Sequence, residues 1–245
     1  MIIQEEPFLS FHNFVIGYGT KKHSKSLSQP FTSIIQRGQL ISLIGLNGVG
    51  KSTLLRTIAG ILPPISGSVT IYGRNIHKLS SVEKSENISV EFPFENARPN
   101  LTVLDYVQLG QYRFSDWLGN MQSENDFLEK VIEQFSLQNY LDRKVDELSD
   151  GEFQRVELAR CIVQQTPLVL LDEPTSHMDY PSREMTMQLL KKMSHDLNKT
   201  IIVSTHELPL AEKYSDRFLM MSQSGNILYT DCWSTDIINS LFAME

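Results

Sequence analysis

The first quarter of the chain changes from strand-like to helical spacing of its apolar residues. Apolar residues recur in a rough strand pattern over 7–16, and the Gly-Tyr-Gly turn at 17–19 ends it. A basic, serine-containing segment over 21–28 predicts a loop. Residues 40–44 are apolar except for Ser42, which predicts a buried strand. Residues 54–59 have helical spacing and stop at a glycine followed by prolines, so we expect a helix there.

The middle of the chain has mostly helical patterns. Thr102 and Ser123 are predicted N-caps, and Ser123 begins a capping-box pattern that Asp126 completes. We therefore expect a helical subdomain at approximately 95–150.

The last third alternates between strands and helices. Apolar runs at 168–171, 200–204 and 217–221 predict strands, and Pro181 opens one of the helices between them. A short strand at 227–229 and a closing helix from Asp236 to Phe242 are also predicted. This alternation is typical of a parallel sheet covered by helices.

Composition excludes several classes of protein. The 245 residues are 41% hydrophobic and 21% charged, as in a globular chain. Lys and Arg total 22 against 29 Asp and Glu, a net charge of −7, so we expect no nucleic-acid partner. Cys161 and Cys232 have no paired spacing, which argues against a disulfide framework and a zinc site and favours a reducing compartment. With no signal-peptide pattern and no run near the ~20 apolar residues that span a bilayer, we expect a chain neither secreted nor itself integral to a membrane.

A glycine-rich loop joins the strand at 40–44 to the following helix. Its glycines let backbone N–H groups turn toward phosphate oxygens. Lys51 would neutralise the β- and γ-phosphates, and Ser52 would bind Mg²⁺. The pattern predicts a nucleotide site, and its candidate residues are Gly45, Leu46, Asn47, Gly48, Val49, Gly50, Lys51, Ser52 and Thr53.

The strand at 168–171 ends in two acidic residues, Asp172 and Glu173. Parallel sheets bind ligands at the carboxyl ends of their strands. Asp172 can there hold Mg²⁺, directly or through water, while Glu173 polarises the attacking water as a general base. An N-cap role is the alternative for either carboxylate.

A third motif connects these two to a known family. Residues 148–155 read Leu-Ser-Asp-Gly-Glu-Phe-Gln-Arg and open a helix; alone they indicate only an N-capped helix. Beside the glycine-rich loop and the paired acids, they resemble the signature sequence of ATP-binding-cassette (ABC) ATPases. The motifs follow the family's order, and the resemblance covers nearly the whole chain.

The resemblance implies roles for further residues. Tyr18 stands where an aromatic residue stacks on adenine, with turn packing as the alternative. His206 resembles the switch histidine that contacts the γ-phosphate, with a structural role as the alternative. Glu173 and His206 also argue against a regulator that binds ATP without hydrolysing it.

The resemblance further implies a head-to-tail dimer of two copies. Ser149, Gly151 and Glu152 of one copy would close over ATP held by Lys51 of the other, and a D-loop containing Asp179 would cross to the partner. Closure by ATP and reopening after hydrolysis would then do the work.

Two positions depart from the family pattern. Asp150 replaces a signature glycine, and we expect it to turn away from the partner's triphosphate because a helix N-terminus favours an acid. The family has a glutamine about forty residues after the lysine of the phosphate loop, but no Gln occurs here between Gln39 and Gln108, and Pro93 stands in its register. Water, Glu91 or Glu95 are the candidate substitutes.

Residues 100–112 and 117–119 resemble the start of the helical subdomain in importers of ferric siderophores, haem and cobalamin; an amphipathic helix packed on the core is the alternative. The resemblance implies an ATPase that energises such an importer from the cytoplasmic face of the cell membrane. Its partners would be integral permease chains and, indirectly, an extracytoplasmic binding protein. A soluble ABC ATPase that remodels a cytosolic partner is the competing hypothesis.

The expected fold is α/β. It combines a P-loop NTPase core of mostly parallel sheet with an N-terminal antiparallel β region and an inserted helical subdomain. We expect a single domain over 1–245, in which 1–94 and 151–245 form the core and approximately 95–150 the insertion.

Overall fold

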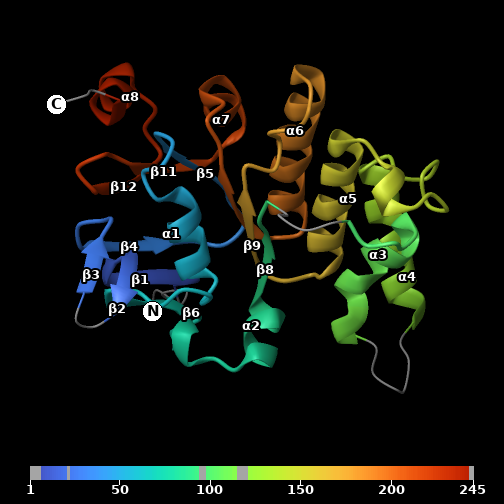
Figure 1. Cartoon of the computed structure of the whole chain (residues 1–245), viewed down its shortest axis with the longest axis horizontal. Coiled ribbons are helices and arrows are strands. Elements are labelled where there is room, and N and C mark those ends of the chain that lie inside the picture. Colours follow the sequence, from blue (N-terminus) through green and yellow to red (C-terminus); the bar gives the residue numbers. More distant parts are fainter. Residues whose placement is uncertain (1–6, 21–22, 94–97, 115–120, 243–245) are drawn as a thin grey trace, which may run out of the picture.

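The computed structural model describes residues 7–20, 23–93, 98–114 and 121–242. A six-stranded, mostly parallel sheet lies at its centre (Figure 1). Its strands, in spatial order, are β12 (Ile227–Thr230), β11 (Arg217–Met221), β5 (Leu40–Gly45), β10 (Thr200–Ser204), β9 (Leu168–Asp172) and β8 (Ile88–Glu91). Only β12 pairs antiparallel, at one edge. The predicted strands at 40–44, 168–171, 200–204, 217–221 and 227–229 are thereby confirmed.

The interior strands are buried on both faces. All residues of β5, β9 and β10 are buried, which explains why their sequences are nearly continuous apolar runs. Alternate residues of β9 belong to two different hydrophobic clusters: Leu168 and Leu170 to one, and Val169 and Leu171 to the other. The sheet therefore separates two cores.

Different helices cover the two faces. α1 (Lys51–Ile58) packs with Leu168 and Leu170, whereas α5 (Asp150–Val163) and α6 (Tyr180–Asp196) pack with Val169 and Leu171. Figure 1 shows α5 and α6 side by side on one side of the molecule and α1 nearer to the N-terminal strands. Two further helices, α7 (Leu208–Tyr214) and α8 (Thr235–Phe242), follow in the last quarter.

A separate antiparallel sheet confirms the expected N-terminal β region. Its order is β4 (Phe31–Ile35), β1 (Leu9–Val15), β6 (Ser66–Ile71) and β7 (Arg74–Asn75). A two-stranded hairpin, β2 (Gly17–Thr20) and β3 (His23–Ser26), follows β1. The predicted loop at 21–28 is therefore wrong for 23–26, where backbone pairing with β2 overrides a polar sequence that has no strand periodicity.

The connection from β7 to β8 is short and well capped. It contains a 3-10 turn, η1 (Ile76–Lys78), and α2 (Ser81–Asn87). Ser80 and Glu83 form a capping box at the start of α2. This helix is not predicted from the sequence, because its residues, SVEKSEN, form no apolar stripe.

The segment between β8 and β9 is helical where the structure describes it. Its elements are α3 (Val103–Gln108), η2 (Leu109–Phe114), α4 (Met121–Gln134), η3 (Val145–Glu147) and α5. The Thr102 N-cap is confirmed, because its Oγ1 accepts a hydrogen bond from the Asp105 N–H at 3.1 Å. The Ser123 N-cap is wrong: α4 already includes Met121, so Ser123 lies inside the helix. The division into core and insertion at 95 and 150 stays a prediction.

Among the described residues, no helix has both the length and the apolar character needed to span a membrane.

A buried polar contact joins β8 to α5. Glu91 is only 4% exposed, and its Oε1 accepts a hydrogen bond from Gln154 Nε2 at 3.4 Å, while its Oε2 has no hydrogen-bond partner within the described residues. Burial, together with the nearby Glu157 and Asp172 carboxylates, raises the pKa of Glu91 to about 8. Glu157 itself accepts hydrogen bonds from Tyr106 and Arg160.

This buried carboxyl predicts a pH-dependent cost to stability. The unfolded chain loses the Glu91 proton near pH ~4.3, whereas the folded chain keeps it up to about pH 8. Stability contributed by this group therefore falls as pH rises between these values. Glu91→Gln removes the titration, so its stability relative to wild type should increase by about 2–4 kcal/mol from pH 5 to pH 8. Urea unfolding at both pH values measures the difference.

Glu86→Gln is the matched control, because Glu86 is an exposed carboxylate in the neighbouring helix α2. The difference in free energy of unfolding between this variant and wild type should be the same at pH 5 and pH 8. A Glu91→Gln difference that is the same at pH 5 and pH 8 would show that Glu91 does not titrate abnormally.

Candidate nucleotide site

The glycine-rich loop runs from the end of β5 to the start of α1, as its sequence predicts. Gly48 and Gly50 have φ values of 77° and 115°, a left-handed region that side chains rarely enter. Lys51 is buried, and its Nζ donates to the carbonyl oxygens of Gly45 at 2.9 Å and Leu46 at 3.2 Å. Burial lowers the pKa of Lys51, while the Glu173 and Asp172 carboxylates oppose that shift. The loop is thus closed around a cation.

A hollow of about 520 Å³ lies over this loop. Residues 46–49 line it together with 25–29 and 223–225. Beside it, the Tyr18 hydroxyl hydrogen-bonds to Thr53 Oγ1, and half of Tyr18 is exposed. The structure therefore places Tyr18 next to the first turn of α1, with part of its ring free to contact a base.

The two acidic residues follow β9 and are held by β10. Ser204 lies opposite Asp172 in the parallel register. Its hydroxyl donates to Asp172 Oδ1 at 2.6 Å and accepts from the Glu173 N–H at 2.9 Å. Glu173 has a φ of 52°, so the chain turns sharply after β9. One hydroxyl thus orients both acidic positions. Sequence reasoning assigned no role to Ser204, although its place at the end of an adjacent parallel strand was a usable signal.

His206 lies between Glu173 and the glycine-rich loop. Its Nδ1 is 3.8 Å from Glu173 Oε2, and its Nε2 is 3.5 Å from Glu207 Oε1. Glu207 in turn is paired with Arg183. His206 and residues 44–47 line one pocket of about 420 Å³. The structure therefore brings together the predicted lysine, the acids and the histidine.

The predicted Mg²⁺ ligands fit a magnesium ion chemically. Ser52 is exposed in the first turn of α1. Asp172 lies two residues after Leu170 in β9, so both side chains are on the sheet face that α1 covers. A hydroxyl and a carboxylate are hard oxygen ligands, which Mg²⁺ prefers. Glu91 pairs with Leu171 and contacts Gln154 on the α5 face, so it is turned away from Ser52. Glu95, the other protein candidate for the missing glutamine, lies outside the described residues.

The signature residues form a capped helix start. Ser149 is the N-cap of α5, where its Oγ accepts from the Glu152 N–H at 3.3 Å and Glu152 Oε2 accepts from the Ser149 N–H at 2.8 Å. The Ser149 N–H and hydroxyl both donate to Glu152 Oε2, and these two bonds lower the pKa of Glu152. Gly151 lies close to the His177 carbonyl oxygen: a Cβ atom placed on Gly151 would be 3.3 Å from that oxygen. Asp179 caps α6 by accepting from the Ser182 N–H at 3.1 Å.

These residues open onto a hollow of their own. Ser149, Gly151, Glu152 and Asp179 line a space of about 320 Å³. None of the residues that line the two hollows at the glycine-rich loop belongs to it. Within one chain, the predicted nucleotide residues therefore form two separate surfaces.

Asp150 forms an ion pair with Arg98, which sequence reasoning did not single out. The same arginine donates to the Leu148 carbonyl oxygen. Asp150 thus turns toward Arg98, while its expected orientation relative to a partner's triphosphate stays a prediction.

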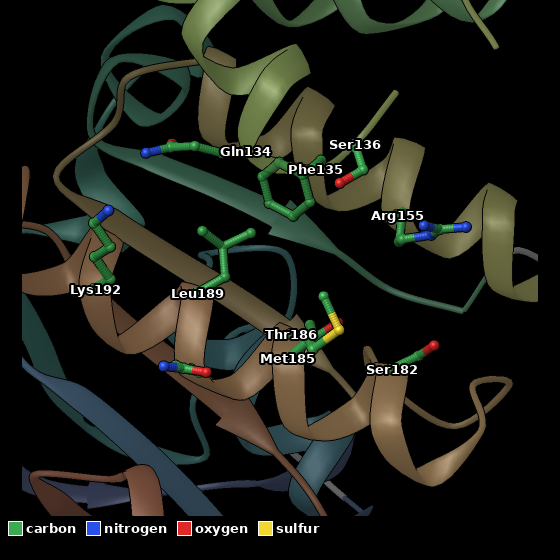
Figure 2. A pocket seen from close by; sticks show the side chains of 10 residues that line it. Gln134, Phe135, Ser136, Arg155, Ser182, Met185, Thr186, Leu189 and Lys192 are labelled. Carbon is green, nitrogen blue, oxygen red and sulfur yellow. The ribbon is translucent and has the colours of Figure 1, made fainter. Parts of the chain in front are cut away.

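A further pocket, of about 250 Å³, lies between the end of α4 and α6 (Figure 2). Phe135, Met185 and Leu189 give it an apolar lining, and Arg155 and Lys192 stand at its margins. None of the predicted nucleotide or metal residues lines it. It is therefore not part of the nucleotide site.

Comparisons with known proteins identify the family. Residues 29–176 match the ABC transporter family. The probable siderophore transport system ATP-binding protein YusV of Bacillus subtilis is 30% identical over 243 residues, covering 97% of this chain and 86% of that protein. The thiamine import ATP-binding protein ThiQ of Photobacterium profundum is 36% identical over 199 residues, covering 81% of this chain and 80% of that protein.

A solved structure agrees in fold. The ATP-binding cassette MJ0796, in a dimeric post-hydrolysis state bound to ADP and Pi, superposes with a TM-score of 0.78 at 25% identity, covering 91% of this chain and 97% of that one. The α/β P-loop fold, ATP as ligand and the family resemblance predicted from the sequence are confirmed. With a family match over more than half of its length and these full-length relatives, the chain belongs to the ABC transporter family as one of its ATPases.

Proposed function

We propose that this ABC ATPase energises an importer of an iron-siderophore, haem or cobalamin by hydrolysing ATP between two copies of the chain. The observation that carries the proposal is the meeting of Lys51, Glu173 and His206 at one edge of the parallel sheet. The siderophore relative covers almost the whole chain, which supports an iron-chelate cargo. The thiamine relative is more identical over a shorter stretch, so the cargo needs a direct test.

Each site residue has a proposed part in hydrolysis. Lys51 and the backbone N–H groups of 46–50 bind the β- and γ-phosphates. Glu173 accepts the proton of the attacking water, and His206, 3.8 Å from it, contacts the γ-phosphate. Mg²⁺ bound by Ser52 and Asp172 would neutralise charge on the phosphates. Tyr18 would stack on adenine with the exposed part of its ring.

The separation of the two surfaces within one chain supports the dimer. Lys51 lies at one surface, while Ser149, Gly151, Glu152 and Asp179 line another. A second copy arranged head to tail would bring the second surface over nucleotide held at the first. ABC importer ATPases act as dimers with membrane permeases.

Two exposed apolar side chains offer a contact site for a partner chain. Ile61 is 55% exposed just after α1, and Val82 is 65% exposed on α2. The two segments are in contact, because Lys84 Nζ donates to the Gly60 carbonyl oxygen at 3.1 Å. Apolar side chains gathered at a surface mark an interaction site. We assign this site to permease chains, which would hold the ATPase at the cytoplasmic face of the cell membrane and link it to an extracytoplasmic binding protein.

Replacing Lys51 tests the phosphate site. Lys51→Ala removes the cation that faces the phosphates and should weaken ATP binding by roughly 10- to 100-fold, as expected for losing a charged hydrogen-bond donor. Equilibrium binding of a fluorescent ATP analogue measures the affinity. Lys78→Ala, which removes a lysine from the η1 turn, is the control. Unaltered affinity of Lys51→Ala would refute the assignment of the loop.

Replacing Glu173 tests the catalytic base. Glu173→Gln keeps the side-chain shape but cannot accept the proton, so turnover should fall about 10²- to 10⁴-fold while ATP still binds. The variant should accumulate as an ATP-bound dimer, which light scattering detects. A turnover rate equal to that of wild type would exclude Glu173 as the base.

Copurification tests the transport role. Affinity-tagged chain, isolated from detergent-solubilised membranes of its native cell, should carry permease chains, and iron chelates or corrinoids delivered by their binding protein should stimulate ATP turnover in proteoliposomes. Replacing both Ile61 and Val82 with Ser should reduce copurification without changing ATP binding. Recovery of soluble partners alone would instead support the remodelling ATPase.

A further inference from the structure

Ser149, Gly151, Glu152 and Asp179 line what we call the signature surface. It carries a negative charge where a second copy's triphosphate is proposed to approach. Asp150 is the first residue of α5, and its side chain is 68% exposed. It lines the signature hollow beside Ser149 and Gly151. Because a triphosphate is strongly anionic, an unopposed carboxylate at this place would repel it.

Arg98 is fixed beside this carboxylate by three contacts. Its Nη2 donates to Asp150 Oδ1, its Nη1 donates to the Leu148 carbonyl oxygen, and its Cζ lies 4.5 Å from the centroid of the Phe153 ring. The Arg98 side chain is 22% exposed. A guanidinium that donates to two acceptors and stacks on an aromatic ring keeps its charge in one place, which a lysine ammonium does less well.

The surroundings of the pair make this cation important. Arg98 and Asp150 also line a pocket of about 180 Å³, to which Glu91, Glu157 and Glu173 contribute. Among the described residues lining that pocket, Arg98 is the one Lys or Arg side chain. Without Arg98, the ionisable residues lining this space would be His177 and carboxyl groups.

We propose that Arg98 is a positioning residue that neutralises Asp150, so that the signature surface can close over the triphosphate held by a second copy. This inference rests on the proposed ATP-bound dimer. Asp150 keeps a favourable place at the N-terminus of α5, while Arg98 cancels its charge toward the incoming nucleotide. Arg98 therefore acts through Asp150 and does not itself bind ATP.

The test is whether removing Asp150 abolishes the need for Arg98. ATP turnover is measured against chain concentration for wild type, Arg98→Ala, Asp150→Gly and the double variant. Arg98→Ala should raise the concentration that gives half-maximal turnover by roughly tenfold, because like charges across an interface oppose association. Binding of the fluorescent ATP analogue to the monomer should not change. The double variant should return to the Asp150→Gly value.

Two further variants separate charge from structure. Arg98→Lys keeps a cation and should recover most of the association that Arg98→Ala loses. Arg74→Ala removes another ion-paired arginine, bonded to Glu83 away from the signature, and should leave turnover unchanged. Thermal unfolding of each variant reports folding independently of turnover.

The possible results have different meanings. A defect of Arg98→Ala that persists in the Asp150→Gly background would overturn the inference and assign Arg98 to packing of Leu148 and Phe153. The inference would also be overturned if Arg98→Ala reached half-maximal turnover at the same concentration as wild type. Turnover of the wild-type chain that is strictly proportional to its concentration, together with a monomeric mass by light scattering in the presence of ATP, would instead refute the dimer of the proposed function, and the inference with it.

Discussion

The parallel register of β9 against β10 is the constraint on which the proposed site depends. This register places Ser204 opposite Asp172, so one hydroxyl bonds to the Asp172 carboxylate and to the Glu173 backbone. A slip of one residue would turn Asp172 to the α5 face of the sheet. The buried apolar residues of β9 oppose that slip, because those on one face pack in one hydrophobic cluster and those on the other face pack in a second cluster. The hydrophobic packing of a strand thus determines where a carboxylate points.

Sequence patterns predict the buried interior of the fold better than its edges. The strands β5, β9 and β10 are nearly continuous apolar runs, which their burial on both faces explains. The edge strand β8 mixes apolar residues with Ser89 and Glu91, and the polar strand β3 has no strand periodicity. Their conformation comes from backbone pairing with distant or neighbouring segments, which side-chain periodicity does not record.

The candidate site also has parts that the sequence predicts and parts that it does not. The glycine-rich loop, the strand-end acids and the signature are contiguous in sequence, so their residue types and spacing are sufficient to recognise them. Arg98 and Asp150 are 52 positions apart, and Glu91 and Gln154 are 63. Such contacts between β8, its following segment and α5 depend on tertiary packing. The two departures from the family pattern could be noticed in the sequence, but the partner of Asp150 could not.

The positive φ of Glu173 has a consequence for how the enzyme is controlled. A non-glycine residue in that conformation is held there by its surroundings, here by the bond from its N–H to Ser204 and by the buried strand before it. The turn that presents the carboxylate is therefore already built in a single chain, at a cost met once during folding. In the proposed dimer, an enzyme whose hydrolytic residues are preset in this way would be switched on by bringing two copies together. Its timing would then follow the mechanics of the assembly that holds them, and not a rearrangement within the subunit.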